Sequence, residues 1–127
     1  MTLTDNLVLN STETTPEVKF NCGNGELEMN GVLLPLDCDA FFNPLLKWLE
    51  AYMSKPALVT KLALKLEYMN TRASKYLFQM LKRMNEHLSK DKKLSVKWVY
   101  DKDDLDMLEA GEDFSALIDS EFVFVEA

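Results

Sequence analysis

The chain has 127 residues, 47% of them hydrophobic and 28% charged, a composition typical of one globular domain rather than a disordered chain. Its formal net charge of −7 argues against nucleic-acid binding, because that function needs basic side chains that neutralise phosphates. No apolar run approaches the ~20 residues of a membrane span. The polar start of the chain is unlike a signal peptide, so we expect a cytoplasmic protein without a membrane segment.

The first fifteen residues are rich in Thr, Asn and Asp, and we expect a poorly ordered leader (residues 1–15) before a single domain (residues 16–127). Apolar and polar side chains then alternate in Glu17–Asn21 and in Glu26–Asn30. The sequence CGNG separates these two runs, and its Gly and Asn residues favour the positive φ angles of a tight turn. The pattern therefore predicts a β-hairpin.

The middle of the chain alternates between helical and strand patterns. Asp39–Ser54 has apolar residues at helical spacing, with Asp37 or Asp39 as its cap, and Pro44 lies either at its first position or further in, where it removes a hydrogen bond. Two later segments alternate apolar and polar residues as β-strands do: Thr60–Tyr68 and Leu94–Tyr100. Each has one apolar and one largely polar face, which predicts that helices cover only one side of the sheet.

The strongest helix prediction is Arg72–Ser89, which lies between these two strands. A strand–helix–strand unit of this kind joins parallel strands by a right-handed crossover. Asp103–Ala110 predicts a short helix ended by Gly111, with another turn or two to about Asp119, and Phe122–Val125 predicts a last strand. The order ββαβαβαβ predicts an α/β, two-layer domain, with a mixed four- to five-stranded sheet and helices mainly on one face.

Charge is unevenly spread along the chain. Residues 101–127 hold ten acidic residues and one lysine, for a net charge of −9, whereas residues 1–100 have a net charge of +2. The acidic quarter is either a solvated face or a docking surface for a basic partner. Asp101–Asp106 lacks the Gly and the ligand spacing of a calcium loop, and with one histidine, His87, the chain cannot complete a usual zinc site. We expect no metal, no cofactor and no catalytic residue.

The most informative segment is the predicted strand-to-helix junction around Asn70 and Thr71. Either residue can cap the helix that follows. A helix N-terminus also accommodates a phosphate, and Arg72 and Lys75 would add charge-assisted partners for it. The residue types leave two interpretations of Thr71 open, a simple cap and a phosphate acceptor.

Four motifs resemble one known family. They are LKLEYMNT at residues 64–71 followed by Ser74 and Lys75, PLLKWLE at 44–50, VKWVYD at 96–101 and EAGEDF at 109–114. Over about Glu17 to Glu126 the chain resembles the SiaC family of regulatory phosphoproteins. The resemblance implies a STAS-like fold, akin to anti-sigma-factor antagonists, and phosphorylation of Thr71 beside Asn70. Family members often continue Thr-Ser-Ser, whereas here Arg72 and Ala73 follow the threonine, so that Ser74 is the alternative acceptor.

The resemblance also implies partner switching. Family members are phosphorylated by a serine/threonine-type kinase of the histidine-kinase-like ATPase class and dephosphorylated by a PP2C-like phosphatase. The bare form binds and stimulates a GGDEF diguanylate cyclase, which raises cyclic di-GMP and favours biofilm formation. We therefore expect a non-enzymatic phosphoprotein that binds partners through Asn70, Arg72 and Lys75. Two alternatives are an anti-sigma-factor-antagonist-like protein that binds a kinase or anti-sigma factor without a cyclase, and a small-ligand-binding STAS domain.

Overall fold

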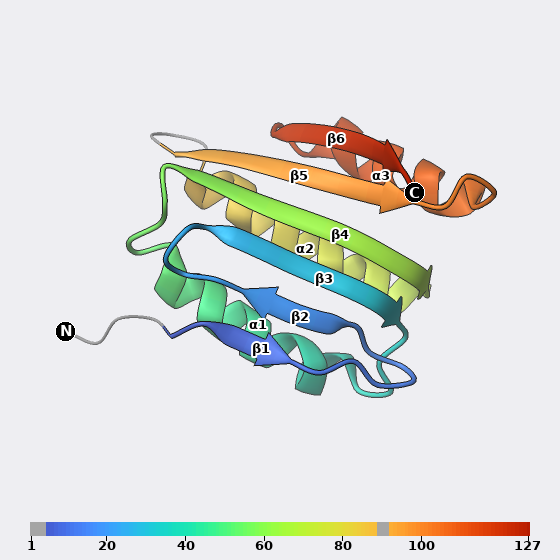
Figure 1. The fold of residues 1–127 in the computed structure, drawn as a ribbon, viewed down its shortest axis with the longest axis horizontal. Coiled ribbons are helices and arrows are strands. Elements are labelled where there is room, and N and C mark those ends of the chain that lie inside the picture. The colour runs from blue at the N-terminus through green and yellow to red at the C-terminus, as the bar shows by residue number, and fades with distance from the viewer. Residues whose placement is uncertain (1–4, 89–91) are drawn as a thin grey trace.

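The computed structural model describes residues 5–88 and 92–127, which form six strands and three helices (Figure 1). In chain order the elements are β1 (Leu7–Leu9), β2 (Glu17–Phe20), β3 (Glu26–Leu33), α1 (Cys38–Tyr52), β4 (Val59–Met69), α2 (Thr71–Leu88), β5 (Lys93–Tyr100), α3 (Leu105–Leu117) and β6 (Glu121–Glu126). In this part of the chain no helix has both the length and the apolar character needed to cross a bilayer.

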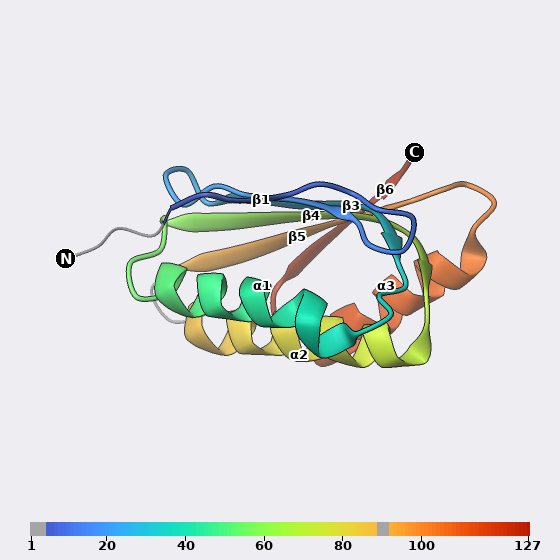
Figure 2. The same cartoon turned by 90° about the horizontal axis from the view of Figure 1, so that it is seen from below.

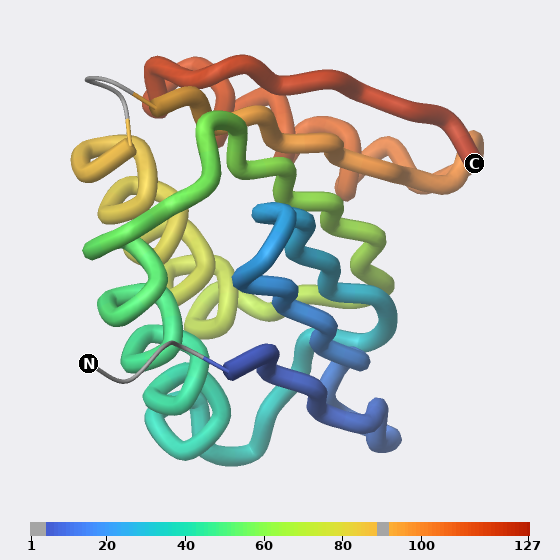
Figure 3. Tube along the Cα trace, turned by 60° about the vertical axis from the view of Figure 1, so that its left-hand side comes forward, coloured from blue at the N-terminus to red at the C-terminus, as the bar shows by residue number. Residues whose placement is uncertain are grey.

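The six strands form one sheet in which the spatial order is the chain order, β1 to β6. The pairs β1–β2 and β2–β3 are antiparallel, and the pairs from β3 to β6 are parallel. All three helices lie on one face of the sheet (Figure 2), and α1 and α2 run side by side (Figure 3). The two-layer α/β class and the mixed sheet are therefore confirmed, with six strands rather than four or five.

The buried face of the sheet follows from the period-2 pattern. The register aligns Met29, Leu64, Trp98 and Phe124 across four neighbouring strands. The first three of these side chains are at most 1% exposed, and they belong to the one hydrophobic core that the sheet shares with the helices. The predicted hairpin is also present, with Gly25 at φ 72° in its turn, where glycine is favoured.

Strand β1 lies within the segment that we expected to be a poorly ordered leader. Leu7 pairs with Phe20 and Leu9 pairs with Val18, so residues 7–9 extend the sheet by one strand. The indole N–H of Trp48 donates a hydrogen bond to the backbone carbonyl of Asp5, which holds the segment against α1. Three residues between polar neighbours are too short for a period-2 pattern to stand out.

Helix α1 begins after Asp37, whose side chain accepts a hydrogen bond of 3.1 Å from the Ala40 N–H. Of the two caps considered, Asp37 is therefore the one used. Pro44 lies inside the helix rather than at its first position. Because proline has no N–H, the helix forgoes one backbone hydrogen bond there.

Helix α3 contradicts the prediction that Gly111 ends a short helix. It runs without interruption from Leu105 to Leu117, and Asp104 caps it by accepting a 3.0 Å hydrogen bond from the Met107 N–H. Gly111 is buried against the indole of Trp98, where an added Cβ would lie 2.6 Å from Nε1. This glycine is required for close packing of helix on sheet, a role that the residue type alone does not distinguish from a helix end.

Candidate functional site

The junction between β4 and α2 contains the predicted acceptor. Asn70 is the capping residue: its Oδ1 accepts a 2.8 Å hydrogen bond from the Ala73 N–H, and its carbonyl accepts one of 2.9 Å from the Ser74 N–H. Thr71 therefore occupies the first helical position instead of the cap. Its side chain is exposed and, within the described residues, makes no hydrogen bond. The cap and the candidate acceptor are thus two different residues.

Substitution of the cap gives a direct stability prediction. Asn70→Ala should lower the free energy of unfolding by about 1 kcal/mol, because the Ala73 N–H loses its side-chain acceptor. Asn70→Asp keeps that acceptor and should be nearly neutral. Urea unfolding followed by circular dichroism measures both. Equal destabilisation by alanine and aspartate would contradict the capping role.

Tyr68, two residues before the cap, departs from the predicted strand pattern. Val32 pairs with Glu67 and Leu33 pairs with Met69, so Tyr68 is an extra residue in β4, a β-bulge. The alternation of Leu62, Leu64, Leu66 and Tyr68 predicts that Tyr68 lies on the apolar face of the strand, but with the bulge the residue is 69% exposed. Its φ of 51° lies in the left-handed region, which is rare for a bulky side chain and is a mark of local backbone strain.

The N-terminal part of α2 also contacts the N-terminal part of α1. The Tyr76 hydroxyl donates a hydrogen bond to Asp39, and its ring stacks on Phe42 with centroids 5.2 Å apart. The bond to Asp39 raises the pKa of Tyr76, and a hydrogen bond to Tyr76 raises the pKa of Arg72. The Arg72 guanidinium therefore lies near the Tyr76 hydroxyl.

The other predicted residues of this turn differ in their exposure. Lys75 is exposed and, in the part of the chain described, forms no ion pair, so its ammonium group is available to a phosphate. Ser74 is half-buried, whereas Thr71 is exposed. Thr71 is therefore more accessible to a kinase than the alternative acceptor, Ser74.

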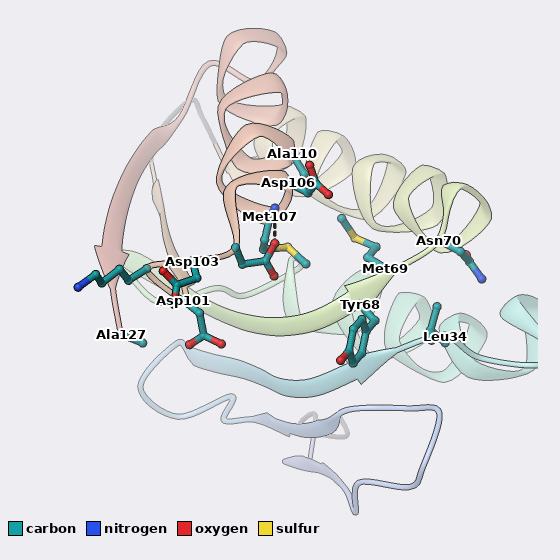
Figure 4. A pocket seen from close by; sticks show the side chains of 12 residues that line it. Leu34, Tyr68, Met69, Asn70, Asp101, Asp103, Asp106, Met107, Ala110 and Ala127 are labelled. Atoms are coloured by element: carbon teal, nitrogen blue, oxygen red, sulfur yellow. Dashed lines mark hydrogen bonds between the residues drawn. The ribbon is translucent and has the colours of Figure 1, made fainter.

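A hollow of about 930 Å³ lies beside this junction, at the carboxyl ends of the parallel strands (Figure 4). Its walls come from the end of β4, from the segments that follow β3, β4, β5 and β6, and from the start of α3. The lining residues are Leu34, Tyr68, Met69, Asn70, Asp101, Lys102, Asp103, Asp104, Asp106, Met107, Ala110 and Ala127. No group of three or more His, Cys, Asp or Glu in residues 5–88 and 92–127 is placed to hold a metal ion.

Asn70 and the acidic run Asp101–Asp106 each stand out in the sequence, but nothing in their local patterns indicates that they lie together. Both segments follow strands that were predicted to be parallel, and the structure shows that these strands are adjacent. The carboxyl ends of such strands meet at one edge of the sheet, where ligands of open α/β sheets commonly bind. That rule is the signal by which the hollow could have been found.

Comparison with known proteins identifies the family of this chain. A model of the SiaC family of regulatory phosphoproteins matches residues 9–127. The chain belongs to the SiaC family. An uncharacterised protein from Pseudomonas aeruginosa strain UCBPP-PA14 is 26% identical over 103 residues, which cover 81% of this chain and 82% of that protein.

Solved SiaC structures share the fold. The crystal structure of apo-SiaC from Pseudomonas aeruginosa has a TM-score of 0.87 at 24% identity and covers 94% of this chain and 98% of its own. A crystal structure of the diguanylate cyclase SiaD in complex with its activator SiaC, from the same organism, has a TM-score of 0.89 at 24% identity and covers 95% and 99%. The SiaC resemblance and the two-layer fold expected from the sequence are thus confirmed.

Proposed function

We propose that this SiaC-family protein is a non-enzymatic partner switch of the cytoplasm, with Thr71 as its phosphate acceptor. The observation that carries the proposal is the exposed hydroxyl of Thr71 at the first position of α2, with Asn70 supplying the cap. Because the hydroxyl is not needed to hold the helix, it can be modified without loss of the cap. Membership of a family of regulatory phosphoproteins supports this proposal.

The start of α2 favours a phosphate at this position. The unpaired N–H groups of a helix's first turn and the positive end of its dipole attract an anion. Lys75 lies four residues after Thr71, on the same face of the helix, and adds a mobile positive charge. No acidic residue lies in the first turn of α2 to oppose the phosphate. Phosphorylation adds a charge of about −1.5 to −2 there.

The switch operates between partners. SiaC of Pseudomonas aeruginosa is the activator of the diguanylate cyclase SiaD and forms a complex with it. By family membership, the bare form of this chain binds and stimulates a GGDEF diguanylate cyclase. A kinase of the histidine-kinase-like ATPase class adds the phosphate, and a PP2C-like phosphatase removes it. The phosphate then weakens cyclase binding by repulsion and by the cost of burying its charge.

Intact-mass analysis after incubation with the cognate kinase tests the acceptor. Wild type should gain one phosphate, and Thr71→Ala should gain none. Ser74→Ala is the matched control, because it removes the neighbouring hydroxyl and should be phosphorylated like wild type. Equal uptake by wild type and Thr71→Ala would contradict the assignment.

A further inference from the structure

The rim of the hollow beside Asn70 is strongly acidic. Asp101, Asp103, Asp104 and Asp106 line it together with a single cation, Lys102. None of the four carboxylates takes part in an ion pair in residues 5–88 and 92–127. Asp104 has a structural role as the cap of α3, which leaves the other three without a structural partner for their charge.

The same hollow has an apolar component. Leu34, Met69 and Met107 line it, and Met107 belongs to the buried core. One large side chain of its lining is exposed: Tyr68, at 69%. Exposed tyrosine beside apolar groups is typical of a protein-binding surface. The hollow therefore offers a partner both contact area and negative charge.

The hollow includes the residue that precedes the proposed phosphate acceptor, Thr71. Asn70 lines the hollow on the side away from Asp101 and Asp103 (Figure 4), and Thr71 directly follows it, so a partner that covers the hollow would meet both the aspartates and a phosphate on Thr71. The phosphate and the aspartates have the same sign of charge. A partner with a basic surface here would bind the phosphorylated form more tightly than the bare form, because both sets of charges attract it.

We propose that this hollow is the docking site of the phosphatase that acts on phosphorylated Thr71, through a basic segment with an apolar or aromatic side chain that packs on Tyr68. The inference rests on the proposed function, since it takes Thr71 as the phosphate carrier. The negative charge of the rim distinguishes the phosphatase from the cyclase as its partner. The cyclase has to leave when phosphate is added, so a basic docking segment at this rim does not suit it. The phosphatase has to select the phosphorylated form, and the rim reinforces that choice.

The test is the rate of dephosphorylation of fully phosphorylated protein by the PP2C-like phosphatase. A triple variant, Asp101→Asn, Asp103→Asn and Asp106→Asn, removes three charges from the rim and keeps the cap of α3. Its kcat/KM should fall about fivefold at low salt, mainly through a higher KM, since each exposed charge contributes modestly. The difference from wild type should shrink as salt is raised, because salt screens exposed charges.

A matched control removes three exposed carboxylates away from the hollow: Glu28→Gln on β3, Glu50→Gln on α1 and Glu86→Gln on α2. It has the same net charge as the rim variant and should be dephosphorylated like wild type. An equal fall in both variants, or no fall in the rim variant, would overturn the assignment. So would a rim variant that is phosphorylated slowly by the kinase but dephosphorylated normally, because the hollow would then serve the kinase.

The phosphorylation step shows whether a negative result concerns only the docking site or also the proposed function. Absence of phosphate on Thr71 in wild type after kinase treatment would overturn both. Normal phosphorylation of wild type and of both triple variants, followed by equal dephosphorylation of all three, would overturn only the docking site. Urea unfolding of the rim variant shows whether it remains folded under the assay conditions.

Discussion

Replacing Thr71 with glutamate should lower the affinity of the protein for its diguanylate cyclase by about tenfold or more, within the usual range of coupling between sites. Thr71 is exposed at the first position of α2, so its side chain is accessible to a partner. A carboxylate at position 71 has to be desolvated or repelled when the cyclase covers the start of α2. Isothermal titration calorimetry with the purified cyclase measures the change.

Two controls separate the local charge from other effects of this substitution. Thr71→Val has nearly the shape of threonine but neither hydroxyl nor charge, and it should bind the cyclase like wild type. Gln79→Glu adds one negative charge at an exposed position further along α2 and should also leave binding unchanged. If Thr71→Glu bound as tightly as Thr71→Val, charge at this position would not control the partner.

The largest effect on stability is expected at Gly111. In Gly111→Ala the new Cβ would lie 2.6–2.7 Å from Nε1, Cδ1 and Cε2 of Trp98. The ring cannot easily move away, because Trp98 is 1% exposed and its N–H donates a 2.9 Å hydrogen bond to the Met107 carbonyl. Overpacking of this kind costs about 1–3 kcal/mol, whereas alanine regains at most about 1 kcal/mol of helix propensity. The net result should be a less stable protein.

Urea unfolding, with the emission of Trp48 and Trp98 as a second signal, measures this loss. Gly23→Ala is a suitable control, because its Cβ would meet only Asn21 Oδ1, at 3.3 Å, in an exposed turn. It should change the free energy of unfolding by less than about 0.5 kcal/mol. A Gly111→Ala protein as stable as wild type would show that helix α3 lies further from the sheet than described.

Much of the fold could be predicted because local sequence and burial agree. Leu62, Leu64 and Leu66 alternate with polar residues and are all buried, and helix α2 has its apolar residues at helical spacing. The failures come from effects that are not local. The bulge at Tyr68 depends on pairing with β3, and the role of Gly111 depends on the indole of Trp98, which lies on another element.

The candidate site shows the same division. A helix cap at this junction could be predicted from Asn70 and Thr71, since both residue types are favoured at a helix start. Which of the two caps the helix depends on the backbone path out of β4, and the bulge at Tyr68 alters that path. The hollow is assembled from segments that follow different strands, so only the topology brings the acidic run to Asn70.

Calorimetric titration of the cyclase with bare protein and with protein fully phosphorylated on Thr71 decides whether Thr71 is a switch. The bare form should bind and raise cyclic di-GMP synthesis, and the phosphorylated form should bind at least about tenfold more weakly and leave synthesis at its basal rate. Equal affinity of the two forms, with equal stimulation of the cyclase, would contradict the proposed function.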